Sequence, residues 1–131
     1  MKHPFIQAVH HIAIICSDYN QSKHFYTQVL NFKIIAETYR EERDSYKLDL
    51  SLNDNYIIEL FSFPHPPARV SRPEACGLRH LAFGISDLDK AITHLQAHHV
   101  ATEPIRVDEL THKRFTFFAD PDGLPLEFYE L

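Results

Sequence analysis

The sequence is short of the residues that mark several common classes of protein. It holds two cysteines in 131 residues, Cys16 and Cys76, and neither lies in a CxxC pair; this excludes a disulfide framework. No apolar run approaches the roughly 20 residues of a membrane-spanning helix, and the stretch after Lys2 lacks the pattern of a signal peptide. The sequence therefore predicts a reduced, cytoplasmic protein with no membrane partner.

Basic residues are outnumbered and scattered. The chain has 13 Lys and Arg residues against 18 Asp and Glu residues, which gives a formal net charge of −5 at pH 7, and the basic residues form no long run. Proteins that bind nucleic acids or anionic membranes present concentrated positive charge. Neither is therefore expected as a partner, and a small-molecule substrate is predicted.

One short motif occurs twice in the chain. The stretch VHHIAIICSDY, which begins at Val9, resembles LRHLAFGISDL, which begins at Leu78, and the alignment places His11 over His80. An approximate repeat of this kind indicates two copies of one structural unit. With 131 residues, the chain is long enough for two small units within one compact domain.

The ends of the two copies also match. IIELF, residues 57–61, resembles PLEFY, residues 125–129, and the alignment places Glu59 over Glu127. Each half therefore has a histidine near its start and a glutamate near its end, 48 residues apart in the first half and 47 in the second. Agreement at both ends of the repeat makes coincidence a weak explanation.

Both halves have the pattern of a βαβββ unit. β-Branched and apolar stretches predict strands, and Asp18 and Asp87 are typical helix N-caps. The predicted strands are residues 9–15, 32–39, 46–52 and 56–62 in the first half and 78–85, 102–107, 114–118 and 124–129 in the second. The fold class is therefore α+β, and a single domain is expected. It comprises module one (about 7–62), a proline-rich linker (63–76) and module two (about 77–131).

Alternation along the strands assigns the histidines and glutamates to particular faces. His11 shares a face with Ala13, and His80 shares one with Ala82. The opposite faces are more apolar, so we expect them to pack under the helices. Both histidines, and by the same alternation both glutamates, are then expected on the concave face, next to small residues that leave room for a ligand.

Two interpretations of these four residues compete. The glutamates could point to solvent from edge strands, and the histidines could be half-buried core residues. However, a carboxylate between apolar neighbours is costly to bury without a partner, and imidazole with carboxylate suits Zn²⁺, Ni²⁺ or Co²⁺, and also Mn²⁺ or Fe²⁺. We therefore predict one divalent metal ion. Its expected ligands are His11, Glu59, His80 and Glu127.

Other polar residues fit this site less well. His10 lies on the opposite face of its strand and aligns with Arg79, which excludes it as a ligand. His94 and His98 have i, i+4 spacing, but no third ligand is evident, so an exposed helix face is predicted. Four basic residues are candidates for binding a substrate carboxylate, with ordinary surface charge as the alternative for each: Arg72, Arg79, Lys113 and Arg114.

The motifs resemble those of the vicinal oxygen chelate superfamily, the group of glyoxalase I and the fosfomycin-resistance proteins. HHIAIICSDYNQSKHFYTQVLNF and GLRHLAFGISDLDKA resemble its two strand–helix motifs, and FFADPDGLPLEFYE is similar to its closing hairpin. The resemblance implies paired βαβββ modules that form a cupped sheet around one divalent metal, and it favours a homodimer. The ligand set that it implies is the one of glyoxalase I: His11, Glu59, His80 and Glu127.

The resemblance also implies a lyase or isomerase of the glyoxalase I type, which acts on a small α-oxygenated carbonyl compound or its thiol adduct. A metal that holds two substrate oxygens would stabilise an enediolate, and Glu127 or Glu59 would serve as the base, with Glu127 preferred. Ile15 and Phe63 stand where glyoxalase I usually has two glutathione-binding residues, so the use of glutathione stays open. The alternatives are another metal enzyme of the superfamily (an epimerase, thiol transferase or dioxygenase) or a non-catalytic small-molecule-binding module.

Overall fold

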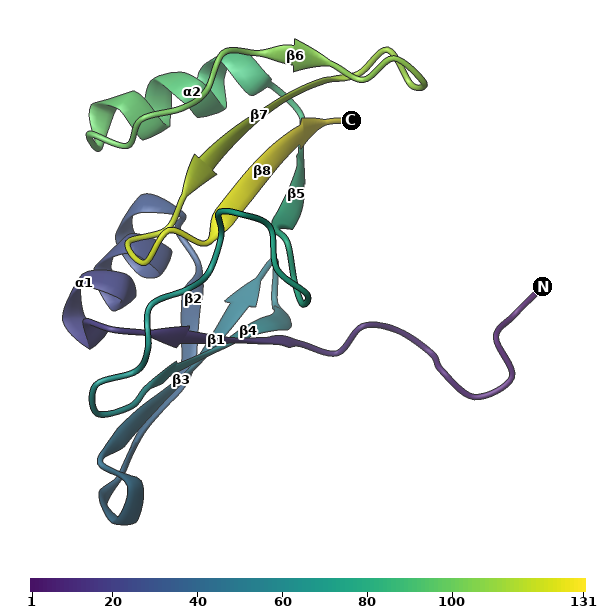
Figure 1. The fold of residues 1–131 in the computed structure, drawn as a ribbon. Helices are drawn as coiled ribbons and strands as arrows, with labels where there is room; N and C mark the ends of the chain where they lie inside the picture. Colours follow the sequence, from purple (N-terminus) through teal and green to yellow (C-terminus); the bar gives the residue numbers. More distant parts are fainter. The chain divides into compact units, whose positions relative to one another are not determined.

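We describe a computed structural model that covers residues 1–131. The chain divides into two compact units, Met1–Pro66 (unit 1) and Pro67–Leu131 (unit 2). Each unit has the order strand, helix, strand, strand, strand (Figure 1). The predicted pair of βαβββ modules is therefore confirmed.

Unit 1 contains a four-stranded mixed sheet. Its strands are β1 (Ile12–Cys16), β2 (Lys33–Arg40), β3 (Ser45–Leu52) and β4 (Asn55–Ser62). They lie in the order β1-β4-β3-β2, with β1 parallel to β4 and the other neighbours antiparallel. Its helical segments are α1 (Tyr19–His24), a π-helical turn (Phe25–Val29) and a short 3-10 turn (Glu41–Arg43).

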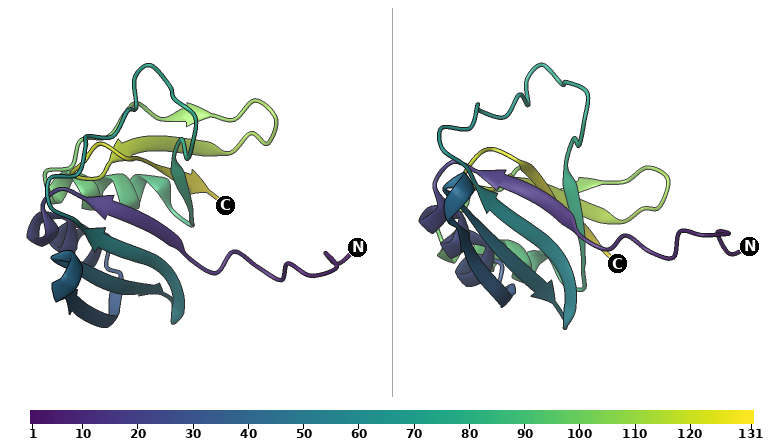
Figure 2. Two further views of the ribbon diagram at one scale, coloured as in Figure 1. Left: turned by 60° about the horizontal axis from the view of Figure 1, so that its bottom comes forward. Right: turned by 90° about the horizontal axis from the view of Figure 1, so that it is seen from below.

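Unit 2 repeats this plan with a longer helix and a shorter edge strand. Its elements are β5 (Leu81–Ile85), α2 (Leu88–Ala97), β6 (Arg106–Val107), β7 (Arg114–Ala119) and β8 (Pro125–Glu130). The strand order is β5-β8-β7-β6, and β5 is parallel to β8 (Figure 2). In both units the first and last strands of the module are therefore neighbours. Neither α1 nor α2 is long and apolar enough to cross a membrane.

Each sheet buries one face, as the alternation predicts. In β1, Ile14 and Cys16 are buried whereas Ala13 and Ile15 are exposed. In β4, Ile58 and Leu60 are fully buried on either side of Glu59, which is not. The core of unit 1 is completed by Phe25, Tyr26, Val29, Phe32, Leu48 and Leu50. The corresponding core of unit 2 contains Leu88, Leu95, Phe118, Leu124 and Leu126.

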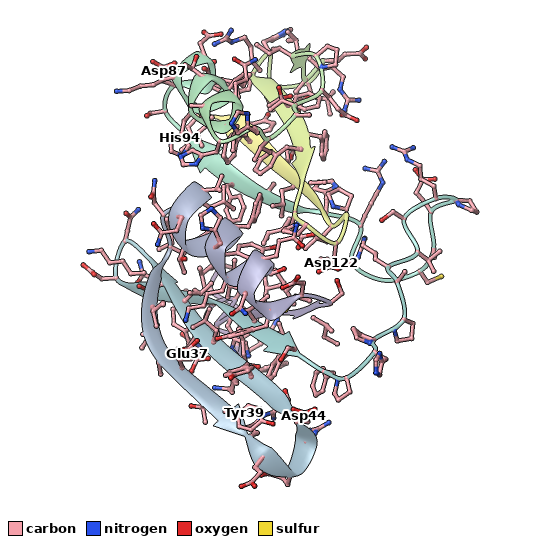
Figure 3. All side chains as sticks on the ribbon, turned by 90° about the vertical axis from the view of Figure 1, so that its left-hand side faces the viewer. Glu37, Tyr39, Asp44, Asp87, His94 and Asp122 are labelled. Atoms are coloured by element: carbon pink, nitrogen blue, oxygen red, sulfur yellow. The ribbon has the colours of Figure 1, made fainter.

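Both helices begin at the predicted aspartates. The Asp18 side chain accepts a hydrogen bond from the backbone N–H of Gln21 at 3.1 Å, and Asp87 accepts one from Lys90 at 3.0 Å. Figure 3 shows Asp87 at the start of α2. These bonds satisfy a backbone donor that the first turn leaves without an intrahelical partner.

The first helix differs from a regular α-helix in its second half. The N–H of Leu30 bonds to the carbonyl of Phe25 at 3.0 Å, which is an i→i+5 bond. The wider turn places Phe25, Tyr26 and Val29 in the core. Spacing alone predicted apolar residues on one helix face, and it did not reveal this change of helix type.

Three predicted strands begin later than expected. β1 begins at Ile12, which pairs with Ile58 of β4. The residue before Ile58 is Ile57, which has no partner in β3 and forms a bulge, so the pairing of β1 with β4 stops there. β5 begins at Leu81 because its partner strand starts with Pro125, which has no N–H to donate. Pro104 has the same effect on β6, although Glu103 N–H still bonds to the Phe117 carbonyl at 2.9 Å.

Removal of either helix cap should destabilise the protein to a similar extent. We expect Asp18→Ala and Asp87→Ala each to lower the free energy of unfolding by about 1 kcal/mol, because each removes the acceptor of a first-turn N–H. Thermal unfolding followed by circular dichroism measures the loss. Glu109→Ala, at an exposed loop position, is the control. A cap variant that melts together with the wild type would show that this cap contributes nothing.

Candidate metal centre

His11 and Glu59 lie side by side in unit 1. β1 runs parallel to β4 with Ala13 opposite Glu59, and His11, two residues before Ala13, lies toward the same face. The Nε2 atom of His11 is 3.9 Å from Oε1 of Glu59. This distance is too long for a hydrogen bond, so the two atoms face each other without being bonded to each other.

The same pair recurs in unit 2. Ala82 of β5 lies opposite Glu127 of β8, and the Nε2 atom of His80 is 3.8 Å from Oε1 of Glu127. The exposed fractions of the side chains also correspond: 37% for His11 and 28% for His80, against 16% and 13% for their glutamates. Each unit thus has a partly exposed imidazole beside a more buried carboxylate.

The other ring nitrogen of each histidine contacts the residue before it in the sequence. His10 Nδ1 is 2.8 Å from His11 Nδ1, and Arg79 Nη1 is 3.5 Å from His80 Nδ1. The His11 ring also stacks in parallel on Tyr56, with ring centroids 5.1 Å apart. These contacts fix the orientation of the His11 ring and leave its Nε2 directed at Glu59.

The two glutamates have different surroundings. The Tyr56 hydroxyl donates to Glu59 at 3.0 Å, and Lys47 Nζ lies 3.5 Å from the same carboxylate. Glu127 accepts no hydrogen bond, and its neighbours on β7 and β5 are Phe117 and Ala82. The Glu59 side chain is therefore held in place by polar partners, whereas the Glu127 side chain has apolar neighbours and no such restraint.

A half-buried group of polar side chains surrounds Glu59 on the same face of the sheet. Asp49, opposite Glu59 on β3, accepts hydrogen bonds from Tyr56 at 2.7 Å and from Lys47 at 2.9 Å. Burial, together with the hydrogen bonds to the two carboxylates, raises the pKa of Tyr56. Burial opposes ionisation of Asp49, but the hydrogen bonds from Tyr56 and Lys47 lower its pKa overall. Tyr56 therefore stays a hydrogen-bond donor, and Asp49 stays an anion, at neutral pH.

Sequence reasoning did not find the role of Tyr56. Strict alternation would place Tyr56 and Glu59, three residues apart, on opposite faces of the strand. The bulge at Ile57 shifts the register of β4, since Leu50 pairs with Ile58 but Ser51 pairs with Tyr56. The bulge thereby brings the Tyr56 hydroxyl to Glu59, and the sequence alone gives no signal for it.

The donor atoms in each pair fit a divalent metal. Two ligands bonded to one ion at about 2.1 Å lie roughly 3.0–3.4 Å apart, so separations of 3.9 and 3.8 Å need only a small closure. Neutral imidazole and carboxylate are suitable donors for Zn²⁺, Ni²⁺ and Co²⁺. No group of three or more His, Cys, Asp or Glu side chains has the geometry of a metal site in the structure. Each unit by itself thus holds one His–Glu pair and no group of three possible ligands.

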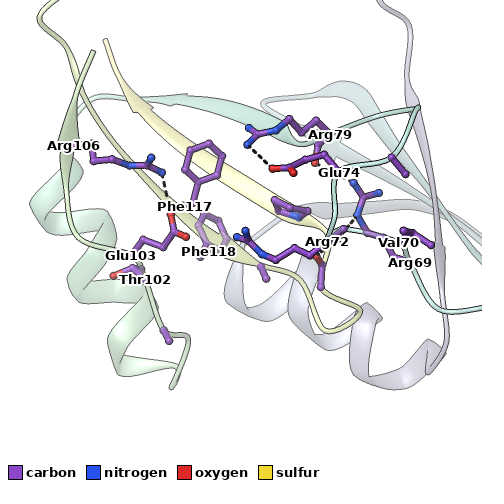
Figure 4. Close-up of a pocket in the computed structure, with 16 residues that line it drawn as sticks. Arg69, Val70, Arg72, Glu74, Arg79, Thr102, Glu103, Arg106, Phe117 and Phe118 are labelled. Atoms are coloured by element: carbon purple, nitrogen blue, oxygen red, sulfur yellow. Dashed lines mark hydrogen bonds and ion pairs between the residues drawn. The ribbon is translucent and has the colours of Figure 1, made fainter. Parts of the chain in front are cut away.

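The remaining candidates from the sequence have other surroundings. His94 and His98 pack ring against ring on the exposed side of α2, with centroids 4.7 Å apart. Arg114 is bound to Glu130 and Asp89, each at 2.9 Å, which removes it as a free site for a substrate carboxylate. Arg72 and Arg79 both line a cavity in unit 2 (Figure 4).

The chain belongs to the Glyoxalase/Bleomycin resistance protein/Dioxygenase superfamily, whose family model matches residues 8–128. It is 66% identical to the uncharacterized protein YwkD of Bacillus subtilis (strain 168), over 95% of this chain and 98% of that protein. The uncharacterized protein YaeR of Escherichia coli (strain K12) is 64% identical, over 95% and 97%.

A solved structure and a more distant enzyme extend this similarity. The crystal structure of a glyoxalase family protein from Enterococcus faecalis superposes with a TM-score of 0.90 at 46% identity, over 96% of this chain and 99% of that one. A 2-epi-5-epi-valiolone epimerase from an Actinomyces species is 28% identical, over 98% of this chain and 81% of that protein. The predicted superfamily and its fold are therefore confirmed.

The ion pair between Arg114 and Glu130 should make stability depend on pH. The Arg114 guanidinium and the Leu88 N–H lower the pKa of Glu130 from 4.5 to about 2. A carboxylate with a lowered pKa stabilises the folded state above pH 4.5, and this contribution is lost as the pH falls toward 2. Glu130→Gln should therefore melt below the wild type at pH 7, and the difference should shrink at pH 3. An unchanged difference at pH 3, or an equal loss in the control Glu109→Gln, would contradict this account.

Proposed function

We propose that the protein is a divalent-metal-dependent lyase or isomerase of the glyoxalase I type. Its proposed metal ligands are His11, Glu59, His80 and Glu127. The observation that carries the proposal is the meeting of a histidine Nε2 and a glutamate Oε1 in both units, at 3.9 and 3.8 Å. In both units the imidazole and the carboxylate face each other without a hydrogen bond, as two ligands of one ion would.

The charge of the proposed ligands favours a doubly charged cation. Two neutral imidazoles and two carboxylates carry a total charge of −2, which one divalent ion balances. His10 supports this role, because its Nδ1 can accept the Nδ1 proton of His11 at 2.8 Å, which leaves the Nε2 lone pair of His11 for the metal. Zn²⁺, Ni²⁺ and Co²⁺ suit the set best, and Mn²⁺ and Fe²⁺ are also compatible.

One ion can bind all four side chains in two ways. Both His–Glu pairs can come from one chain, or each of two chains can contribute one pair. The second arrangement would make the site depend on a homodimer. The homodimer and the cytoplasmic location remain predictions.

The expected substrate is a small α-oxygenated carbonyl compound or its thiol adduct. When bound, the metal polarises the carbonyl oxygen and makes the adjacent C–H more acidic. A carboxylate that reaches this carbon takes the proton and returns it to the neighbouring atom, which isomerises the substrate.

Glu127 is the better candidate for this base. Glu59 is held by the Tyr56 hydroxyl at 3.0 Å and by the Lys47 ammonium at 3.5 Å, which favours a fixed ligand. Glu127 lies between Phe117 and Ala82 and accepts no hydrogen bond, so it can turn toward a substrate without breaking one. We therefore assign proton transfer to Glu127 and a fixed role in holding the metal to Glu59.

Ile15 and Phe63, the two positions that depart from the glyoxalase I pattern, do not define a thiol partner for the substrate. Ile15 offers an exposed apolar side chain, and Phe63 packs against Phe61 and under the guanidinium groups of Arg40 and Arg43. Neither provides a specific contact to glutathione. The 28% identical epimerase favours epimerisation as the second candidate, since it would begin with the same removal of a proton. A second proton donor would then protonate the opposite face of the same carbon.

Metal binding should require the histidine of each His–Glu pair. We expect one divalent ion per chain after incubation with Ni²⁺ or Zn²⁺ and gel filtration, measured by elemental analysis. His11→Ala and His80→Ala should each reduce the bound metal severely, because each removes one of four ligands. His94→Ala, on the exposed side of α2, is the matched control and should bind as the wild type does. Full binding by both site variants would rule out the proposed ligand set.

The two glutamates should differ in how their loss affects turnover. With methylglyoxal and glutathione as a test substrate, Glu127→Gln should lower kcat by about 10²–10⁴, the usual contribution of a general base, while much of the metal is retained. Glu59→Gln should chiefly weaken metal binding, and added metal should restore part of its activity. The opposite pattern would exchange the two roles. No turnover by the fully metal-loaded wild type would exclude glyoxalase I activity in the strict sense.

A further inference from the structure

Unit 2 contains a cavity next to the His80–Glu127 pair. Its volume is about 620 Å³, and its walls come from the linker, the segment before β6, and strand β7. Two wall residues contact His80 directly: Arg79 approaches its Nδ1 at 3.5 Å, and the Phe117 ring packs edge-on against it with centroids 5.0 Å apart. Phe117 also lies opposite Glu127. The cavity therefore lies directly beside the pair, with Arg79 and Phe117 belonging to the surroundings of both.

The cavity is positively charged although the chain as a whole is negative. Its charged lining residues are four arginines and two glutamates: Arg69, Arg72, Arg79, Arg106, Glu74 and Glu103. Four positive and two negative charges leave +2, in a chain whose formal net charge is −5. A positively charged cavity in a negatively charged protein favours an anionic ligand.

Three of the four arginines already have partners. Arg69 donates to Ser71 Oγ and to the carbonyls of Leu78 and Arg79, and thereby fixes the fold of the linker. Arg79 pairs with Glu74 at 3.5 Å, and Arg106 pairs with Glu103 at 3.0 Å.

Arg72 is the exception. It forms no hydrogen bond or ion pair, and its charge acts only at longer range on Glu74. Figure 4 shows its side chain extending toward Phe118 in the cavity. A guanidinium presents a planar set of donors that matches the two oxygens of a carboxylate or phosphate. Arg106 lies beyond Phe117 in the same view, with its guanidinium 5.2 Å from the Phe117 ring centroid. Arg72 and Arg106 thus provide positive charge on two sides of an aromatic floor.

We propose that this cavity binds an oxyanion, a carboxylate or phosphate, at the end of the substrate remote from the reacting carbon, with Arg72 as its principal contact. The volume of about 620 Å³ is within the range of roughly 300–1,000 Å³ for small-molecule sites, so the oxyanion belongs to a larger molecule. The link to catalysis rests on the proposed function, whereas oxyanion binding itself needs no metal. Arg72 and Arg79 were candidates from the sequence, and the cavity distinguishes the unpaired Arg72 from the paired Arg79.

Binding of simple probes to the full-length chain tests this proposal. Isothermal titration calorimetry with inorganic phosphate, glutarate and neutral glutaramide should give saturable binding of at least one of the two anions and none of the amide. Binding of phosphate alone would identify a phosphate ester as the ligand, and binding of glutarate alone would identify a carboxylate. Arg72→Gln should weaken the anion at least about tenfold, as expected for the loss of a charged hydrogen-bond donor, and Arg72→Lys should restore part of the affinity.

The control is Lys90→Gln, which removes the same charge from an exposed position of α2 outside the cavity. Arg106→Gln should weaken the anion less than Arg72→Gln, because Arg106 is shared with Glu103. Absence of anion binding by the wild type, wild-type affinity in Arg72→Gln, or an equal loss in Lys90→Gln would overturn the proposal. Titrations of chelator-treated protein separate the two proposals: anion binding without any metal binding would remove the enzyme proposal alone, and metal binding without anion binding would remove this one alone.

Discussion

The register between the first and last strand of each module is the constraint on which the candidate site depends. In each unit, parallel pairing sets an alanine opposite the glutamate: Ala13 opposite Glu59, and Ala82 opposite Glu127. The histidine two residues before that alanine then lies beside the carboxylate. The small alanine side chain leaves space above the strand, where a larger residue would separate the two donors. A shift of one residue would turn every side chain of the strand to the other face, so the buried apolar residues on the opposite face preserve the pair.

The two units have kept this register but diverged around it. The position opposite Glu59 on the neighbouring strand is Asp49, which belongs to a hydrogen-bonded group with Tyr56 and Lys47. The equivalent position opposite Glu127 is Phe117, which also lines the arginine-rich cavity. Polar side chains thus restrain Glu59, whereas Glu127 has apolar neighbours and lies beside the cavity. This asymmetry supports the proposed roles, in which Glu59 is a fixed metal ligand and Glu127 is the base.

Much of the fold could be predicted from the sequence, because both copies of the repeat contain local patterns that are typical of strands and helix caps. The βαβββ order, the helix caps at Asp18 and Asp87, and the buried face of each sheet are confirmed. Features that depend on a break in regularity could not be predicted. A bulge at Ile57 reorients Tyr56, and Arg69 folds the proline-rich linker into a cavity wall through bonds to backbone carbonyls. Alternation rules do not describe either feature, since both depend on non-local contacts.

X-ray absorption spectroscopy of the protein loaded with Ni²⁺ or Zn²⁺ tests the central claim most directly. If one imidazole and one carboxylate from each unit bind a common ion, the spectrum should show two imidazoles and only nitrogen or oxygen donors, at about 2.0–2.2 Å. One imidazole per ion, or a sulfur donor near 2.3 Å, would show that the two pairs do not share a metal.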